Sequence, residues 1–247
     1  MSAKSIWARR KRALLKIENL EAYYGSAYIL QGVSLEVGQG QGVALLGRNG
    51  AGKSTMFKSI MGLGPRTHGA MYFKGKDLMR MKPYRRARLG IAYIPEDRRI
   101  FSDLSVVDNL IIGQNAAVGR TEPYSIDEIM EFFPLLKDLR TRQGSQMSGG
   151  QQQILTIARS LMSRPELILL DEPMEGLAPL VVQHLAHMIT GFCTRSGVAL
   201  LVADQNLWFC RQCTTDVYLM DQGKTIFSGS WAAFDARGEL KTKYLAV

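Results

Sequence analysis

Short, almost wholly apolar runs recur along the chain, and segments with helical spacing separate them. They lie at 91–94, 167–170, 199–202 and 217–220. Such runs are typical of strands buried on both faces, and their alternation with helical segments predicts a mainly parallel sheet covered by helices. A further run at 42–46 precedes a glycine-rich turn, and apolar residues with helical spacing follow at 54–63. This stretch therefore predicts a strand, a loop and a helix in succession.

The two ends and the middle of the chain follow other patterns. Residues 14–35 alternate short apolar stretches with glycine, which predicts an antiparallel β layer. The sequence Asp-Gln-Gly-Lys at 221–224 predicts the turn of a hairpin. Between about 106 and 146, apolar residues instead repeat every three or four positions, which predicts a helical insertion. We therefore expect one α/β domain over 14–247, with a helical subdomain at about 100–160 inserted in its core.

The composition is that of a globular protein. The 247 residues are 46% hydrophobic and 21% charged, which excludes disordered and collagen-like classes. No apolar run approaches the roughly 18 residues that cross a bilayer. Residues 1–13 form a basic arm without the apolar stretch of a secretory signal, and three cysteines, an odd number, suit a reducing compartment. The net charge of +9 suits nucleic acid, an anionic membrane or polyphosphate ligands equally well.

A glycine-rich segment follows the predicted strand at 42–46. Its sequence, Gly-Arg-Asn-Gly-Ala-Gly-Lys-Ser, fits the phosphate-loop pattern G-x-x-x-x-G-K-[ST] in the context that the pattern requires. Glycines let the backbone wrap around phosphates, the helix N-terminus supplies oriented N–H groups, and Lys53 supplies a mobile positive charge. Ser54 is a candidate ligand for Mg²⁺. The residues predicted to bind the nucleotide here are Gly47, Asn49, Gly50, Gly52, Lys53, Ser54 and Thr55.

Two carboxylates follow the apolar run at 167–170. Asp171 stands at the carboxyl end of the predicted strand, where open α/β sheets bind ligands, and is predicted to complete the Mg²⁺ site. Glu172 is a candidate to accept a proton from an attacking water. The phosphate loop and these two carboxylates together predict hydrolysis of a nucleoside triphosphate.

A second segment suited to phosphate lies at 148–151, just before a helical segment with one apolar face. Ser148, Gly149, Gly150 and Gln151 form a helix N-terminus with small residues, but no lysine or metal ligand accompanies them. A two-fold dimer would place each such partial site over the nucleotide of the other subunit. Closure of the dimer would then depend on ATP.

The segments at 47–55, 147–151 and 167–173, in this order, resemble those of the ATP-binding cassette ATPases of ABC transporters. The resemblance extends from about residue 14 to the end of the chain and implies a P-loop NTPase fold, with ATP and Mg²⁺ as ligands. Met147 stands where the family usually has leucine. Tyr24 resembles the aromatic residue that stacks on adenine in this family, although an ordinary strand tyrosine is the alternative.

At two positions the sequence differs from most cassettes, and these differences point to a particular subfamily. Glu96 stands where most cassettes have glutamine, and Gln205 stands where most have histidine. A carboxylate still accepts a hydrogen bond from a metal-bound water, and an amide can contact a γ-phosphate but cannot titrate. Together with Glu172, these two are the predicted catalytic residues. Glu96 also joins Ser54 and Asp171 as a predicted metal-site residue.

Both departures resemble the second ATPase subunit of branched-chain amino-acid importers, as does Ala178 in place of the family's usual interface aspartate. This resemblance implies a subunit that powers uptake of branched-chain amino acids or related small polar solutes. The implied partners are transmembrane permease subunits, a second ATPase that is either a paralogous chain or a copy of this one, and indirectly a periplasmic solute-binding protein. The cassette would lie peripherally on the cytoplasmic face of the inner membrane, and no nucleic acid is expected.

Two alternatives belong to other classes of protein. The charge of +9 keeps open a non-transport ABC ATPase that acts on nucleic acid or the ribosome. A nucleotide-binding regulator without turnover is the other alternative, and the presence of both Asp171 and Glu172 counts against it.

Two further features are expected to be structural. Cys210 and Cys213 form a lone C-x-x-C without the second pair of a zinc site, so packing is expected. Arg85, Arg86 and Arg88 belong to a basic stretch that is expected to be a solvated face. The alternative for this stretch is a docking surface for the loops and lipid headgroups around a membrane partner.

Overall fold

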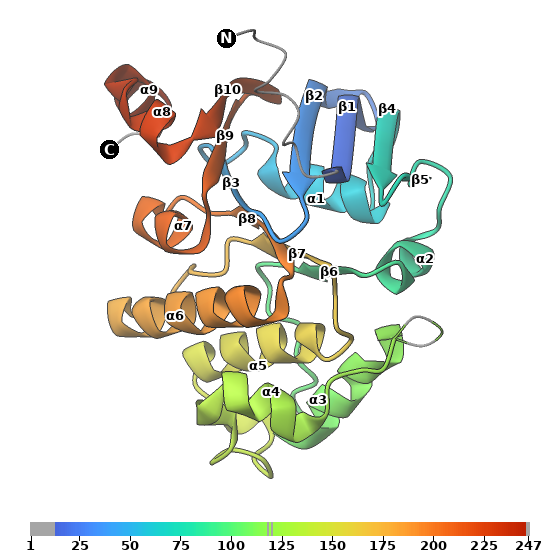
Figure 1. Ribbon diagram of the computed structural model, residues 1–247, viewed down its shortest axis with the longest axis vertical. Coiled ribbons are helices and arrows are strands. Elements are labelled where there is room, and N and C mark those ends of the chain that lie inside the picture. Colours follow the sequence, from blue (N-terminus) through green and yellow to red (C-terminus); the bar gives the residue numbers. More distant parts are fainter. Residues whose placement is uncertain (1–12, 118, 120, 246–247) are drawn as a thin grey trace, which may run out of the picture.

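The computed structural model describes residues 13–117, 119 and 121–245, and a six-stranded sheet lies at its centre (Figure 1). Strand β3 pairs in parallel with β8 and β9, and β7 pairs in parallel with β6 and β8, whereas β10 runs antiparallel to β9. The predicted mainly parallel sheet and the hairpin at 221–224 are confirmed. In the order of the sheet, the strands are β10 (Lys224–Ser230), β9 (Asp216–Asp221), β3 (Gly42–Leu46), β8 (Ala199–Ala203), β7 (Leu167–Asp171) and β6 (Ile91–Ile94).

A second sheet is antiparallel throughout its four strands. In sheet order they are β2 (Ala27–Gly38), β1 (Ala13–Tyr24), β4 (Arg66–Phe73) and β5 (Lys76–Asp77). The predicted antiparallel β layer is confirmed. Strand β1 begins at Ala13, the last residue of the predicted basic arm, and the rest of that arm lies outside the described residues.

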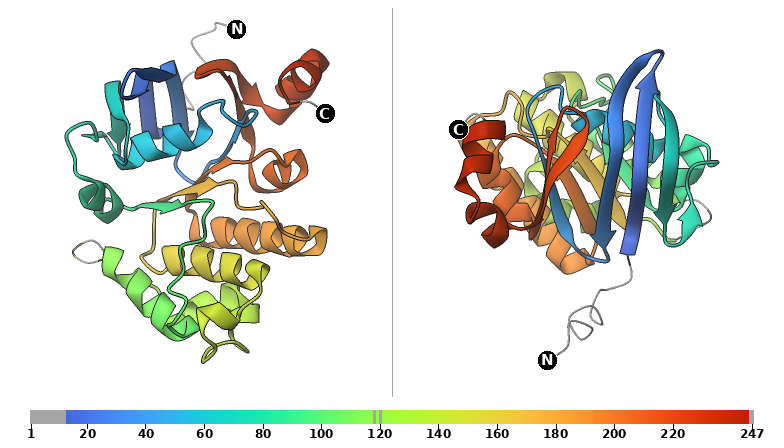
Figure 2. Two further views of the ribbon diagram at one scale, coloured as in Figure 1. Left: turned by 180° about the vertical axis from the view of Figure 1, so that it is seen from behind. Right: turned by 90° about the horizontal axis from the view of Figure 1, so that it is seen from above.

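Helices cover the central sheet and form one end of the molecule. Figures 1 and 2 show α3, α4 and α5 at the end opposite the antiparallel sheet. Between 95 and 166, the described residues form helices, turns and loops and contribute no strand to either sheet. The α-helices are α1 (Lys53–Met61), α2 (Pro83–Arg88), α3 (Val106–Gln114), α4 (Ile126–Phe132), α5 (Gly149–Leu161), α6 (Pro179–Ser196), α7 (Leu207–Cys213), α8 (Trp231–Asp235) and α9 (Gly238–Tyr244). Short 3-10 helices lie at Asn115–Ala117, Pro134–Leu136 and Gly144–Gln146.

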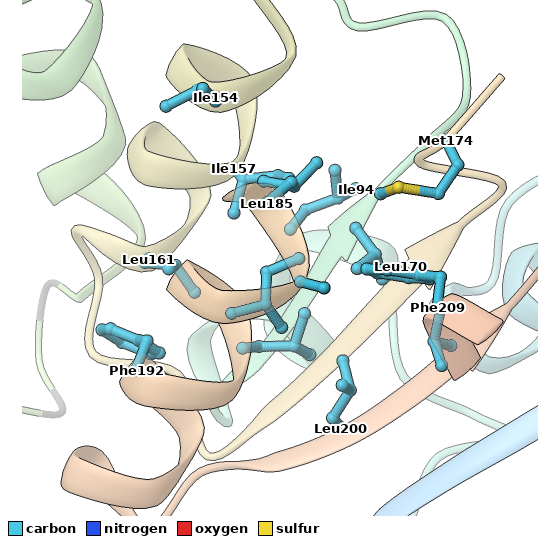
Figure 3. Close-up of a cluster of buried hydrophobic side chains, with 14 of the residues drawn as sticks. Ile94, Ile154, Ile157, Leu161, Leu170, Met174, Leu185, Phe192, Leu200 and Phe209 are labelled. Carbon is cyan, nitrogen blue, oxygen red and sulfur yellow. The ribbon is translucent and has the colours of Figure 1, made fainter. Parts of the chain in front are cut away.

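Alternation along the central strands divides the apolar side chains between two cores. In β7, Leu167 and Leu169 belong to one core, and Ile168 and Leu170 belong to the other, as the two-residue period of a strand requires. The first core is closed by α1 and the antiparallel sheet. The second is closed by α5, α6 and α7, and Figure 3 shows side chains of these helices packed over the sheet. The sheet is therefore held rigidly from both faces, which fixes the loops at its edge.

Within the described residues, we find no helix that combines the length and the apolar character needed to span a bilayer.

The C-x-x-C pair packs inside the second core. Cys210 is buried and Cys213 is partly buried. Burial raises the pKa of Cys213 to about 11 and that of Cys210 well above its ordinary value, so both thiols stay protonated near neutral pH. No cysteine belongs to a group of metal-ligating side chains in the part of the chain that the structure describes. The packing prediction is confirmed.

The basic stretch at 85–88 was expected to be a solvated face or a docking surface, and this prediction is wrong for Arg86. Its side chain is only 4% exposed. The guanidinium Nη1 donates to the carbonyls of Ser59 and Ile60, both at 2.8 Å, and Nε donates to Met81 O at 3.0 Å. The first two carbonyls belong to the last turn of α1, where a helix has no internal donors left. Arg86 therefore caps the helix that follows the phosphate loop, whereas Arg85 and Arg88 are exposed.

We expect Arg86→Leu to lower the free energy of unfolding by about 2–4 kcal/mol, because it leaves the Ile60 carbonyl without a donor and removes the hydrogen bonds of the guanidinium to Ser59 and Met81. Urea denaturation measures this loss. Arg85→Leu is the matched control, and we expect it to change the free energy of unfolding by less than about 0.5 kcal/mol. Equal stability of the two variants would contradict the capping role.

Candidate functional site

The candidate site lies at the carboxyl ends of the parallel strands. Strand β3 leads into the phosphate loop, β7 ends at Asp171, β8 is followed by Asp204 and Gln205, and β6 is followed within two residues by Glu96. Parallel strands bring their carboxyl ends to one edge of a sheet, so four segments distant in sequence converge there. A cavity of about 390 Å³ lies among them, and it is lined by Ile29, Asn49, Gly50, Gly52, Lys53, Ser54, Thr55, Glu96, Glu172 and Glu175.

The phosphate loop requires glycine at specific points. Gly47 has a φ of 155°, and a Cβ there would lie 2.6 Å from the carbonyl oxygen of Met220. Gly52, with a φ of 103°, precedes α1 and offers no side-chain cap. The first N–H groups of α1 therefore point toward the cavity without a side-chain acceptor from the N-cap residue. A helix N-terminus in this condition favours an anion.

Lys53 is the buried cation of the phosphate loop, with 4% of its surface exposed. Its Nζ donates to the carbonyls of Gly47 at 2.8 Å and Arg48 at 3.2 Å. The same atom forms an ion pair with Glu172 Oε1 at 2.9 Å. The lysine is thus held at the cavity by acceptors that a phosphate oxygen can replace, and Glu172 is one of them.

Asp171 is buried below the cavity and receives two hydrogen bonds. Its Oδ1 accepts from Ser54 Oγ and its Oδ2 accepts from the Tyr93 hydroxyl, both at 3.1 Å. Burial raises the pKa of Asp171, and these two hydrogen bonds oppose that rise. Ser54 and Asp171 therefore place two oxygen ligands together, the donor set that Mg²⁺ prefers. Tyr93 was absent from the predicted site, since an aromatic residue inside an apolar run gives no sign of its hydroxyl's partner.

Three carboxylates converge at the cavity. Oxygens of Glu96, Glu172 and Glu175 all lie within 4.8 Å of one another. A hydrogen bond with Glu175, and then burial, raises the pKa of Glu96. Glu175 was not predicted either, although its place three residues after Glu172 could have suggested it. The cavity thus combines a cationic loop with excess negative charge, which suits a phosphate group that arrives with a divalent cation.

Gln205 contacts the phosphate loop directly. Its Nε2 donates to Asn49 Oδ1 at 2.6 Å, so the residue after β8 reaches the loop that follows β3. Its neighbour Asp204 is buried, and its Oδ2 has no hydrogen-bond partner among the described residues.

Gly47, Asp171 and Gln205 are outside the cavity lining but hydrogen-bond to residues that form it, whereas two other predicted groups lie apart from it. Ser148 caps α5 by accepting from the backbone N–H of Gln151, and Gln151 Oε1 accepts in return from the N–H of Ser148. Neither these residues nor Gly149 and Gly150 line the cavity. Tyr24 is also outside its lining, with 41% of its surface exposed. Ile29 of β2 is the apolar residue that the structure places at the cavity instead.

A family model described as ABC transporter matches residues 30–175, more than half of the chain. The chain belongs to the ABC transporter family. Its α/β fold is that of an ATP-binding cassette, and it is an ATPase subunit of a transporter.

Relatives of this cassette serve different transporters. The high-affinity branched-chain amino acid transport ATP-binding protein BraG of Pseudomonas aeruginosa is 34% identical over 94% of this chain and 99% of its own length. The lipopolysaccharide export system ATP-binding protein LptB of Escherichia coli is 35% identical, over 88% of this chain and 91% of its own. Identity to these relatives alone therefore leaves the solute open.

Solved cassettes have the same fold. The crystal structure of a nucleotide-free ATP-binding cassette from an ABC transporter superposes with a TM-score of 0.76, at 28% identity, and covers 89% of this chain and 92% of that one. The ADP conformation of the cassette MJ1267 gives the same values.

Proposed function

We propose that this cassette powers uptake of branched-chain amino acids or related small polar solutes. The observation that supports this proposal most is a pair of residues, Glu96 and Gln205. Glu96 lines the cavity where most cassettes have glutamine, and Gln205 contacts the phosphate loop where most have histidine. This pair resembles the second ATPase of branched-chain amino-acid importers. The match to BraG over 99% of that protein's length also supports a role in amino-acid uptake.

The phosphate loop and the carboxylates after β7 have distinct roles in the proposed hydrolysis. Lys53, with the N–H groups of the loop at 47–52 and the start of α1, would hold the phosphates, and Ser54 and Asp171 would hold Mg²⁺. Glu172 would orient the attacking water and take its proton. The uncapped start of α1 and the paired oxygens of Ser54 and Asp171 are what these ligands require. Mg²⁺, when bound, would neutralise phosphate charge.

Binding of a phosphate would change the partners of Lys53. A phosphate oxygen competes with Glu172 for the lysine Nζ, and the carboxylate that loses this competition becomes available to accept a proton. Glu96 and Gln205 would sense the γ-phosphate. Glu96 lies in the cavity lining, and Gln205 donates a hydrogen bond to Asn49 of the phosphate loop. Thr55 lines the cavity beside Ser54, and we assign Tyr24 to the adenine, beyond the phosphate end.

The segment 148–151 requires a second cassette. Ser148, Gly149, Gly150 and Gln151 lie outside the cavity of their own chain, so we propose that they cover ATP held by another one. That other cassette is a paralogous chain or a copy of this one. Permease subunits would hold the pair at the cytoplasmic face of the inner membrane, a periplasmic solute-binding protein would deliver the solute, and nucleic acid has no part.

Solute uptake in cells tests the direction and the cargo. We expect deletion of this chain to abolish high-affinity uptake of radiolabelled leucine or a related polar solute, and the wild-type chain to restore it. The Glu172→Gln variant serves as the matched control that should not restore uptake. Unchanged uptake together with defective export of an envelope lipid would contradict the proposal and favour the LptB-like alternative.

The amide at position 205 bears on how ATPase activity depends on pH. Because an amide does not titrate, we expect no loss of ATPase activity from residue 205 near pH 6.5, the ordinary pKa of histidine. Gln205→His should add such a dependence, since its imidazole would gain a proton beside the loop as the pH falls. The pH profiles of the assembled transporter with each residue provide the comparison. Identical profiles would argue against contact between residue 205 and the reacting phosphate.

A further inference from the structure

The loop between β6 and α3 connects the nucleotide cavity to α5. Glu96 lies at its start and lines the cavity. Arg98 and Arg99 follow with φ angles of 53° and 43°, in the left-handed region that residues other than glycine rarely adopt. Two consecutive residues in this region persist only where surrounding contacts hold them.

Helix α5 supplies those contacts. Thr156 Oγ1 donates to the carbonyl of Arg98 at 2.6 Å, and Arg159 Nη2 donates to the carbonyl of Arg99 at the same distance. The loop that carries Glu96 is therefore fastened by two hydrogen bonds to the helix whose N-terminus is the 148–151 segment.

The side chain of Arg98 extends this connection to the beginning of α5. A Cβ placed on Gly149 would lie 2.7 Å from Arg98 Nη1, so the guanidinium packs directly on the first residue of the helix. A Cβ on Gly176 would lie 3.9 Å from Nη2, which places the other side of the guanidinium near the loop after β7. Glycine at 149 is thus required for this contact, beyond any approach of phosphate.

Local stability does not explain this placement. A cation at a helix N-terminus is unfavourable, because that end of the helix already carries partial positive charge. Among the described residues, no carboxylate lies within ion-pair distance of Arg98, whereas its neighbour Arg99 pairs with Asp97 at 2.7 Å. Arg98 is therefore held at the start of α5 without the compensation that a structural arginine usually has.

We propose that Arg98 is a positioning residue that sets the N-terminal end of α5 according to the position of Glu96. The inference rests on the proposed function, in which Glu96 meets the nucleotide of its own chain and Gly149 meets that of the other cassette. A displacement of Glu96 passes through two residues of backbone to the guanidinium and from there to Gly149. The two hydrogen bonds from α5 fix the body of the loop, and the Arg98 side chain carries the position of Glu96 to the first residue of the helix.

Kinetics of the assembled transporter test this role, with Arg98→Gln, Arg98→Lys and the matched control Arg99→Gln. We expect Arg98→Gln to lower kcat by about 10- to 100-fold, because misplacing a group that completes a site costs this much. KM for ATP should stay within about twofold, since the residue does not hold its own chain's nucleotide. Arg98→Lys should retain more activity than Arg98→Gln, and Arg99→Gln should match the wild type.

Affinity of the isolated chain for Mg-ATP, measured by titration calorimetry, is the second readout and also verifies folding. We expect the wild type and all three variants to bind equally. Equal kcat for Arg98→Gln and Arg99→Gln would overturn the inference, as would a loss of Mg-ATP affinity that accounts for the loss of activity. Absence of hydrolysis by the wild-type transporter would overturn the proposed function itself, and the inference with it.

Discussion

Replacing Glu172 with glutamine is expected to lower ATP turnover by about 10²- to 10⁴-fold, the usual contribution of a general base. Glutamine has nearly the same shape but cannot take a proton from water. Binding of Mg-ATP should be retained or strengthened, because the variant removes the carboxylate that pairs with Lys53 Nζ at 2.9 Å and competes with phosphate. Phosphate release and nucleotide titration on the same preparation measure both effects.

Glu131→Gln is the control for this experiment, since Glu131 is exposed on α4 and far along the chain from the cavity residues. It should hydrolyse and bind ATP like the wild type. Turnover by Glu172→Gln at the wild-type rate would show that another group accepts the proton, and Glu96 or Glu175 would then be the nearest carboxylate candidates.

Asp204→Asn is expected to remove a pH dependence from the stability of the fold. Burial raises the pKa of Asp204 from the ordinary 3.8 to about 6. Well below pH 4 the group is protonated in both the folded and the unfolded chain. Between about pH 4 and pH 6 the unfolded chain loses this proton while the folded chain keeps it, so stability falls across this window and stays level above it. A pKa rise of this size corresponds to about 3 kcal/mol.

Urea denaturation at pH 4.5 and pH 7.5 provides the measurement. The stability of Asp204→Asn relative to the wild type should increase by about 2 kcal/mol between these two pH values, since part of the cost of ionisation is already present at pH 4.5. Asp138→Asn, at an exposed position, is the control and should follow the wild type at both. A constant difference between Asp204→Asn and the wild type would mean that Asp204 titrates normally in the folded chain.

Much of the fold could be predicted because its patterns are local. Each central strand is a short apolar run, and its two-residue period divides residues such as Leu169 and Leu170 between the two cores. The phosphate loop could be recognised because it is continuous in sequence, and the structure gathers its residues with Glu96 and Glu172 around one cavity. The carboxyl edge of a parallel sheet explains why segments so far apart meet there.

The features that sequence missed depend on contacts between distant segments. Tyr93 belongs to an apolar run, and only the pairing of β6 with β7 brings its hydroxyl to Asp171. Arg86 stands among exposed arginines, and only the packing of α2 against the end of α1 shows that it is buried. Composition and spacing carry no information about such pairs. The same holds for Arg98, whose guanidinium meets Gly149 through the folding of a long insertion.

The rate of phosphate release per chain as a function of protein concentration tests whether hydrolysis requires two cassettes. Residues 148–151 lie outside the cavity of their own chain, and under the proposed function a lone cassette therefore lacks part of its site. With a copy of itself as partner, the rate per chain should rise steeply with concentration and then level off. With a paralogous chain as partner, the rate should be negligible at every concentration. A substantial rate per chain that stays constant down to high dilution would contradict the need for a second cassette, because one cassette would then hydrolyse ATP by itself.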